Sequence, residues 1–164
     1  MPGMSPSSFF YGFVAEDHED WKTERSSIRR GFHLAVSAFH LSEHYFRYYK
    51  CHSPEFAERY KKGGLKSFHE ELAKRAPSFR DIWDIANAYK HLYTYDDCSI
   101  ASTGAIEIIT SQNLEIDHDW DGDDSTEIII RHRNGSISHF SPAIEDVMQM
   151  WSHIIIHNVD PSAI

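Results

Sequence analysis

The chain has 164 residues, of which 41% are hydrophobic and 25% charged, and this balance is typical of one globular domain and excludes a collagen-like or largely disordered chain. The formal net charge of −9 disfavours nonspecific binding of duplex nucleic acid, because lysine and arginine contacts to phosphate dominate that affinity. Apolar runs are only a few residues long, far below the roughly 20 that a membrane helix needs, so we expect no membrane span. The first 15 residues lack the basic and apolar segments of a secretory signal, which predicts a cytoplasmic protein.

Apolar residues recur at helical spacing through the first part of the chain. The longest helical pattern contains one glycine, Gly31, where the helix could break. Ser53-Pro54 is typical of a helix start, because serine caps the free N–H groups and proline fits the first turn. Ser78 is placed to cap a later helix in the same way. Helices are therefore predicted over residues 20–49, 54–62, 65–76 and 79–95.

After Tyr95 the hydrophobic period changes from about 3.6 to 2 residues, which indicates strands. The alternating apolar positions are Ile106, Ile108, Leu114, Ile116, Ile128, Ile130 and Ile137. Asn134-Gly135 is a strong signal for a two-residue hairpin turn, and Ser141-Pro142 predicts the start of a last helix. We expect a single α+β domain over residues 1–164. Its parts are a helical bundle over 18–95, an antiparallel β-meander over 104–140 and a C-terminal helix over 142–157.

The acidic residues gather in the second part of the chain. Residues 1–95 hold 14 basic and 12 acidic side chains, a net charge of +2, whereas residues 96–164 hold 2 and 13, a net charge of −11. Asp117, Asp119 and Asp121 precede Gly122 and match the first half of a calcium-binding loop. Ile128 stands where the second half of that loop carries glutamate. The segment is therefore either a weak cation site or a solvated acidic hairpin loop.

Three histidines and an arginine, His33, His40, His44 and Arg47, share one face of the longest predicted helix. Apolar residues border this stripe on both sides, so we expect the histidines to face the protein interior. Residues 40–44 spell H-L-S-E-H and match the H-x-x-E-H pattern of inverted zinc peptidases. In that chemistry His40 and His44 would bind the metal, and Glu43 would activate a metal-bound water. Partly buried, hydrogen-bonded core histidines are the alternative interpretation.

The predicted helix over residues 79–95 carries a second pattern. Residues 86–91 spell A-N-A-Y-K-H and resemble the signature of HEPN-family helical domains. Asn87 and His91 match that signature, and Ala86 stands where the family carries arginine. The resemblance covers about residues 15–95. It implies an all-helical bundle that is often dimeric and that is either a metal-independent RNase or an inactive relative of one.

Two functions of different class follow. In the first, the chain is a HEPN-like module that contacts RNA or a partner protein, with or without catalysis. If Arg47 and His44 pack against Asn87 and His91, Arg47 could replace the missing arginine, and His91 would act as general acid or base on a ribose hydroxyl. In the second, the stripe of His33, His40 and His44 serves a metal-dependent hydrolase. A purely structural or interaction role and a homodimer also remain open, and no cofactor is identified.

Overall fold

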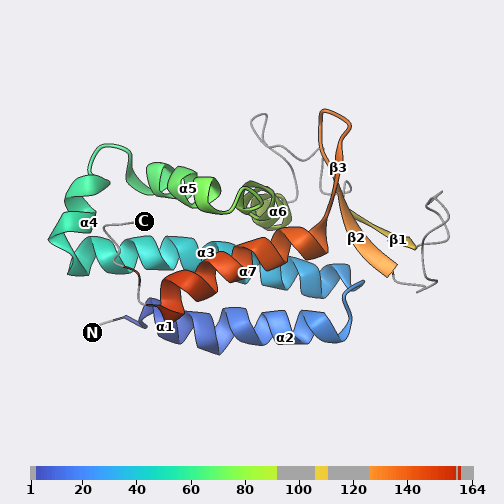
Figure 1. The fold of residues 1–164 in the computed structure, drawn as a ribbon, viewed down its shortest axis with the longest axis horizontal. Coiled ribbons are helices and arrows are strands. Elements are labelled where there is room, and N and C mark those ends of the chain that lie inside the picture. Colours follow the sequence, from blue (N-terminus) through green and yellow to red (C-terminus); the bar gives the residue numbers. More distant parts are fainter. Residues whose placement is uncertain (1–2, 92–105, 111–125, 158, 160–164) are drawn as a thin grey trace.

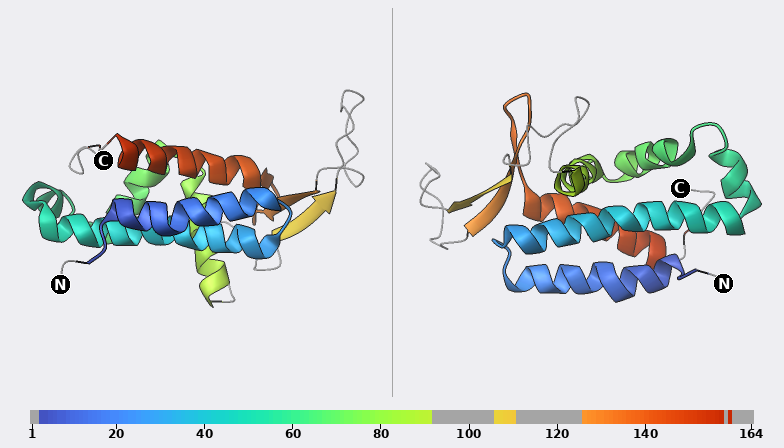
Figure 2. Two further views of the ribbon diagram at one scale, coloured as in Figure 1. Left: turned by 90° about the horizontal axis from the view of Figure 1, so that it is seen from below. Right: turned by 180° about the vertical axis from the view of Figure 1, so that it is seen from behind.

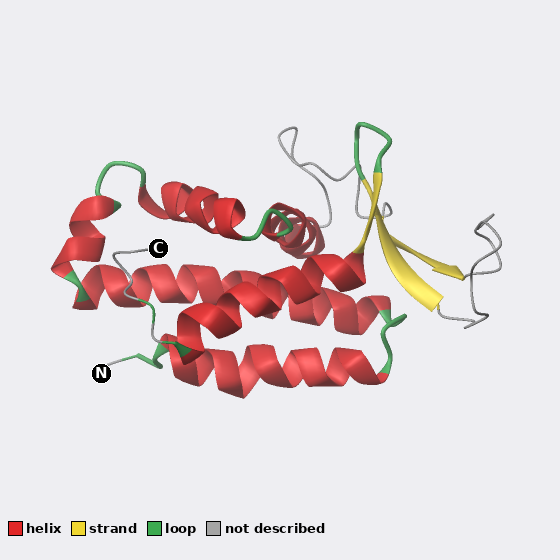
Figure 3. Ribbon diagram, viewed as in Figure 1, coloured by secondary structure: helices red, strands yellow, loops and turns green. Residues whose placement is uncertain are grey.

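The structure is a computed structural model, and it describes residues 3–91, 106–110, 126–157 and 159. The described chain is mainly helical, with one small sheet at one end (Figures 1 and 3). This agrees with the α+β class predicted from the sequence. The helices are α1 (Pro6–Phe9), the π-helix η1 (Phe10–Val14), α2 (Ala15–Thr23), α3 (Ile28–His52), α4 (Pro54–Arg59), α5 (Gly64–Arg75), α6 (Phe79–His91) and α7 (Phe140–Ile156). The strands are β1 (Ile106–Thr110), β2 (Thr126–Arg131) and β3 (Ile137–His139).

Helices α1, η1 and α2 form one continuous run that lies antiparallel beside α3 (Figure 1). The predicted helix over residues 20–49 is therefore wrong in its bounds, because the chain turns at residues 24–27 and Gly31 lies inside α3. Ser27 is the N-cap residue of α3, but its side chain makes no capping hydrogen bond. The guanidinium of Arg30 joins the two helices across this turn, since its Nε lies 3.4 Å from a carboxylate oxygen of Asp20.

The helix-start signal at Ser53-Pro54 is confirmed. The Ser53 hydroxyl oxygen accepts a hydrogen bond of 3.2 Å from the backbone N–H of Phe56, and Pro54 occupies the first turn of α4. Ser5 and Pro6 form the same signal at the start of α1, where the Ser5 side chain accepts from the N–H of Ser8 at 3.1 Å. Helix α1 was absent from the sequence-based prediction, although the same chemistry marks its beginning.

The sheet is antiparallel, with the strand order β1-β2-β3. The turn after β2 differs from the predicted two-residue hairpin. The N–H of Gly135 donates to the carbonyl of His132 at 3.0 Å, and the N–H of His132 donates to the carbonyl of Ser136 at 2.9 Å. Gly135 has φ +84°, a left-handed conformation that glycine adopts without a Cβ penalty. The loop therefore has three residues and ends in a glycine bulge, the next commonest hairpin form.

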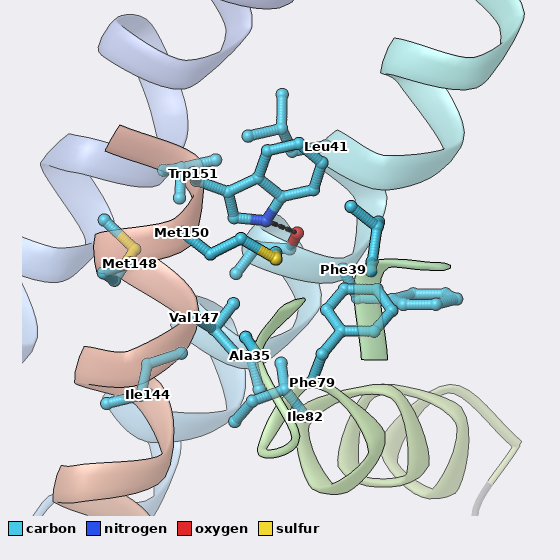
Figure 4. Packing of buried hydrophobic residues seen from close by; sticks show 14 of the residues in the cluster. Ala35, Phe39, Leu41, Phe79, Ile82, Ile144, Val147, Met148, Met150 and Trp151 are labelled. Carbon is cyan, nitrogen blue, oxygen red and sulfur yellow. Dashed lines mark hydrogen bonds between the residues drawn. The ribbon is translucent and has the colours of Figure 1, made fainter. Parts of the chain in front are cut away.

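Helix α7 lies across α3 and completes the core (Figures 1 and 2). It begins at Phe140, two residues before the predicted start, and its N-cap residue is His139. Trp151 is fully buried, and its indole N–H donates to the backbone carbonyl of Ala38 in α3 at 3.1 Å (Figure 4). One face of α7 is apolar and faces the core, and its buried side chains are Ile144, Val147, Met148, Trp151 and Ile155.

Gly31 lets the sheet and α7 approach α3 closely. A Cβ atom at this position would lie 2.9 Å from Cδ1 of Ile128 in β2 and 3.4 Å from Phe140 in α7. Ile85 of α6 lines the same small void beside Gly31. One residue of α3 is thus the meeting point of the bundle, the sheet and the last helix. Among the described helices, none is long and apolar enough to cross a membrane.

Candidate functional site

The histidine stripe of α3 lies on the outside of the bundle. His33 and Arg47 are exposed, and His40 and His44 are half-buried, so the expectation of an inward-facing stripe is wrong. The side of α3 opposite the stripe is buried instead, at Ala35, Ala38, Ser42, Leu34, Leu41, Phe39 and Phe46. The two apolar borders of the stripe are therefore the edges of one wide buried arc, and small residues at its centre allow close helix packing.

His44 contacts the N-terminal segment rather than a metal-ligand set. One ring nitrogen, Nε2, lies 2.6 Å from the backbone carbonyl of Met4, which only a protonated Nε2 can satisfy as donor. The His44 ring also stacks on Phe9, with 5.1 Å between ring centroids. In the part of the chain that the structure describes, no group of three or more histidine, cysteine or acidic side chains converges as metal ligands. His40 and His44 therefore have no described third ligand.

Arg47 does not lie beside Asn87. Ile85 of α6 lies beside Phe32 of α3, and Arg47 is 15 residues further along α3, which corresponds to about 22 Å at the rise of an α-helix. Helix α6 crosses α3 at a steep angle (Figure 2), so Asn87, close to Ile85 in α6, stays at the opposite end of α3 from Arg47. Ala86 is buried. Arg47 therefore does not pack against Asn87 in this structure.

A partly buried polar cluster joins α6 to the β2–β3 hairpin, and the sequence analysis missed it. The Ser138 hydroxyl donates to Oδ2 of Asp81 at 3.1 Å, so its oxygen accepts from Nε2–H of His132 at 2.8 Å. His132 Nε2 is also 3.7 Å from Oδ2 of Asp81. Asp84, one turn further along α6, is buried. No spacing within α6 indicated this cluster, because the partners of Asp81 come from the β2–β3 hairpin.

The electrostatics of this cluster are those of a buried acid. Burial raises the pKa of the Asp81 carboxyl, and His132 and the Ser138 hydrogen bond oppose that rise while Asp84 adds to it. Serine, histidine and aspartate are all present, but their order differs from a catalytic triad. The Ser138 proton points to the carboxylate and not to the histidine, so His132 does not activate the hydroxyl as a nucleophile. The cluster attaches the hairpin to α6.

A second buried histidine, His69 of α5, is also structural. The Ser42 hydroxyl donates to the carbonyl of Phe39 at 2.6 Å, so Nε2–H of His69 donates to Ser42 at 2.9 Å. Aromatic rings of Phe39, Phe79 and Trp83 surround it. Burial lowers the pKa of His69 to about 4. The imidazole is therefore neutral near pH 7.

Exposed apolar side chains gather near the N-terminus. Of the five large hydrophobic side chains that are exposed in the described chain, Met4, Tyr11 and Phe13 lie within ten residues of each other, and Ile137 and Ile156 lie elsewhere. The rings of Phe13 and Phe9 are 5.1 Å apart, and Phe9 stacks on His44. We call the surface formed by Met4, Phe9, Phe13 and His44 the aromatic face. Phe13 belongs to the π-helix η1, and π-helical turns are often found at functional sites.

The remaining candidates are Asp117, Asp119 and Asp121, which lie outside the described residues, so the cation site stays a prediction. The His91 side chain is likewise outside the described part of α6. A comparison with models of known protein families, with curated proteins and with solved structures finds no match. These comparisons therefore assign no role to the candidate residues.

Proposed function

We propose that this chain is a HEPN-like binding module that contacts a partner protein through its aromatic face. The observation that carries this proposal is that the ring of exposed Phe13 packs on Phe9, which stacks on His44. Exposed Met4 contacts the same histidine through its backbone carbonyl, and Met4 and Phe13 are 46% and 47% exposed. Contiguous exposed apolar side chains with a polar rim are typical of protein interaction sites. The polar rim here includes Arg47, which follows His44 by one helical turn and is exposed.

Two features favour binding without cleavage of RNA. Cleavage of RNA would need a cation beside His91 to stabilise charge on the phosphate. Arg47 was the candidate for that cation, but it lies at the far end of α3 from Asn87, which shares α6 with His91. The net charge of −9 also opposes the long-range attraction that brings nucleic acid to a protein. The chemistry of the aromatic face fits an apolar side chain of the partner with a carboxylate beside it, placed against Arg47.

The test compares the aromatic face with another exposed hydrophobic site on the same chain. A photo-crosslinking phenylalanine at position 13, and in a separate variant at position 137, is used to capture the partner in extracts of the source cells. The captured protein is identified, purified and titrated against wild type, Phe13→Ser and Ile137→Ser. Ile137 is a matched control because it is also exposed, at 50%, but lies on β3.

We expect capture from position 13 only, and a Kd that Phe13→Ser weakens by about tenfold or more, as for an aromatic interface anchor. Ile137→Ser should leave the Kd within about twofold. Equal Kd values for the two variants would contradict the proposal. Single-stranded RNA that binds at physiological salt, with binding abolished by both Phe13→Ser and Arg47→Ala, would identify RNA as the ligand in place of a protein.

A further inference from the structure

Two histidines near the end of α7 lie side by side, at the end of that helix away from the sheet (Figure 1). His153 and His157 are one helical turn apart, and side chains at this spacing are neighbours on the surface of a helix. The centroids of their imidazole rings are 5.1 Å apart, with an angle of 49° between the ring planes. Both residues are exposed. We call these two side chains the histidine pair.

The ring nitrogens of the histidine pair are available to a ligand. Within the described part of the chain, neither imidazole makes a hydrogen bond or an ion pair. His40 and His44 have the same spacing on α3 and provide a contrast. There, Nε2 of His44 is hydrogen-bonded to the carbonyl of Met4, and the His44 ring stacks on Phe9.

The distance between the rings of the histidine pair matches two imidazoles bound to one tetrahedral metal ion. Zinc binds imidazole nitrogen at about 2.0–2.1 Å, and each ring centre lies roughly 1.2 Å behind its nitrogen, so a tetrahedral angle places the two centres about 5 Å apart. The right angle of an octahedral ion would bring the centres to about 4.5 Å at the same bond length. Imidazole also suits zinc chemically, whereas magnesium and calcium prefer oxygen ligands.

The charges around the histidine pair are compatible with a bound cation. His157 is the C-cap residue of α7, and the C-terminal end of a helix carries a partial negative charge that attracts cations. His153 also lines a cleft with Arg75 and Asp146, whose opposite charges leave the cleft without a net charge. Asp146 precedes His153 by two helical turns, about 10 Å along the helix axis, so it stands too far away to be a ligand.

We propose that His153 and His157 form a zinc-binding site on the surface of α7. Each histidine provides one ring nitrogen. Water occupies the other coordination positions, since no third metal-binding side chain converges on the pair within the described residues. The bound ion links the last two turns of α7 and stabilises the folded helix, because a ligand that binds only the folded state favours it. The site shares no residue with the aromatic face, so this inference is independent of the proposed partner.

The experiment is a titration of the whole, untagged protein with zinc chloride, followed by NMR of the imidazole signals. It is carried out at about pH 7.5, where an ordinary histidine is neutral. The signals of the pair are assigned as those missing from His153→Ala and from His157→Ala. Zinc should shift both signals together in wild type, and magnesium at the same concentration should shift neither.

The His153 signal also reports the Kd of the site in variants that keep His153. We expect His157→Ala to weaken this Kd by about tenfold or more, because the second ligand of a chelate binds at a high effective concentration. The double variant Ser152→His with His157→Ala restores the number of histidines but places them at adjacent positions, which do not face each other, so it should bind as weakly as His157→Ala. His33→Ala removes an exposed histidine of α3 and should keep the wild-type Kd.

Two results would overturn the inference. One is a His153 signal that does not shift in wild type up to about 1 mM zinc. The other is a Kd at His153 that is the same in wild type and in His157→Ala. Both side chains are exposed, so alanine at either position should leave the fold intact and the comparison valid.

Discussion

His69 shows how one buried side chain ties stability to pH. Its pKa of about 4 in the folded protein lies below the ordinary value of 6.5, because burial disfavours the charged imidazole. The unfolded chain therefore binds more protons than the folded one between these two values. Stability from this residue is complete above about pH 6.5 and falls as the pH drops towards 4. The difference corresponds to a loss of about 3 kcal/mol.

We predict that His69→Gln flattens this dependence. The glutamine amide can still donate to Ser42 but does not titrate, so the variant should lose less unfolding free energy than wild type between about pH 6.5 and 4.5. Urea unfolding at a series of pH values measures the difference. His153→Gln removes an exposed histidine and should retain the wild-type slope. An unchanged slope in His69→Gln would show that other groups cause the acid sensitivity.

Local sequence signals predicted the side chains that bond to backbone groups a few residues away. They did not predict side chains that bond to residues distant in the sequence. Serine caps work through neighbours three residues away, which is why Ser53 could be assigned from the sequence. His69 and Ser42 are 27 residues apart, and Asp81 and Ser138 are 57 apart. No spacing within one helix or strand indicates such pairs. The partly buried cluster at the hairpin therefore emerged only from the three-dimensional arrangement.

At the scale of elements, Gly31 sets how closely α3 can pack against β2 and α7. A valine there would place its Cβ 2.9 Å from Ile128 and add two methyl groups in the same crowded space. We predict that Gly31→Val lowers the unfolding free energy by about 2–3 kcal/mol through overpacking. Gly12→Val is the matched helical control, because a Cβ at Gly12 meets no atom within 4 Å. Its effect should stay within about 0.5 kcal/mol, and urea unfolding of both variants distinguishes them.

The spacing of apolar residues predicted which segments are helices and strands. It predicted less well where these elements begin and end, and which side of each faces the core. Apolar residues spaced by 3.6 and by 2 identified helices such as α5 and α6 and the strands that contain Ile128 and Ile137. The histidine stripe was given the wrong direction because both of its borders are apolar. The centre of the buried arc is marked by the small residues Ala35, Ala38 and Ser42, whose low hydrophobicity hides the core side of α3.

At the scale of the whole molecule, the C-terminal helix α7 packs against the N-terminal helices and completes their core. Trp151 donates to Ala38 across 113 residues of sequence, and its ring lies 5.9 Å from that of Tyr45 in α3. Forming such a long-range contact closes a long loop of chain, and this loop closure has an entropy cost that folding must overcome. The core of the N-terminal helices is therefore incomplete until α7 is in place.

We predict that Trp151→Ala strongly destabilises the domain. Truncating a fully buried tryptophan costs about 3–5 kcal/mol, against a total of about 5–15 kcal/mol for a typical domain. Ile156→Ala changes the same helix at an exposed side chain, 57% accessible, and should cost less than about 0.5 kcal/mol. Urea unfolding followed by circular dichroism measures both variants. If Trp151→Ala unfolded at the same urea concentration as Ile156→Ala, the N-terminal helices would form a stable core without the Trp151 contact. Helix α7 would then pack on the bundle without being required for its stability.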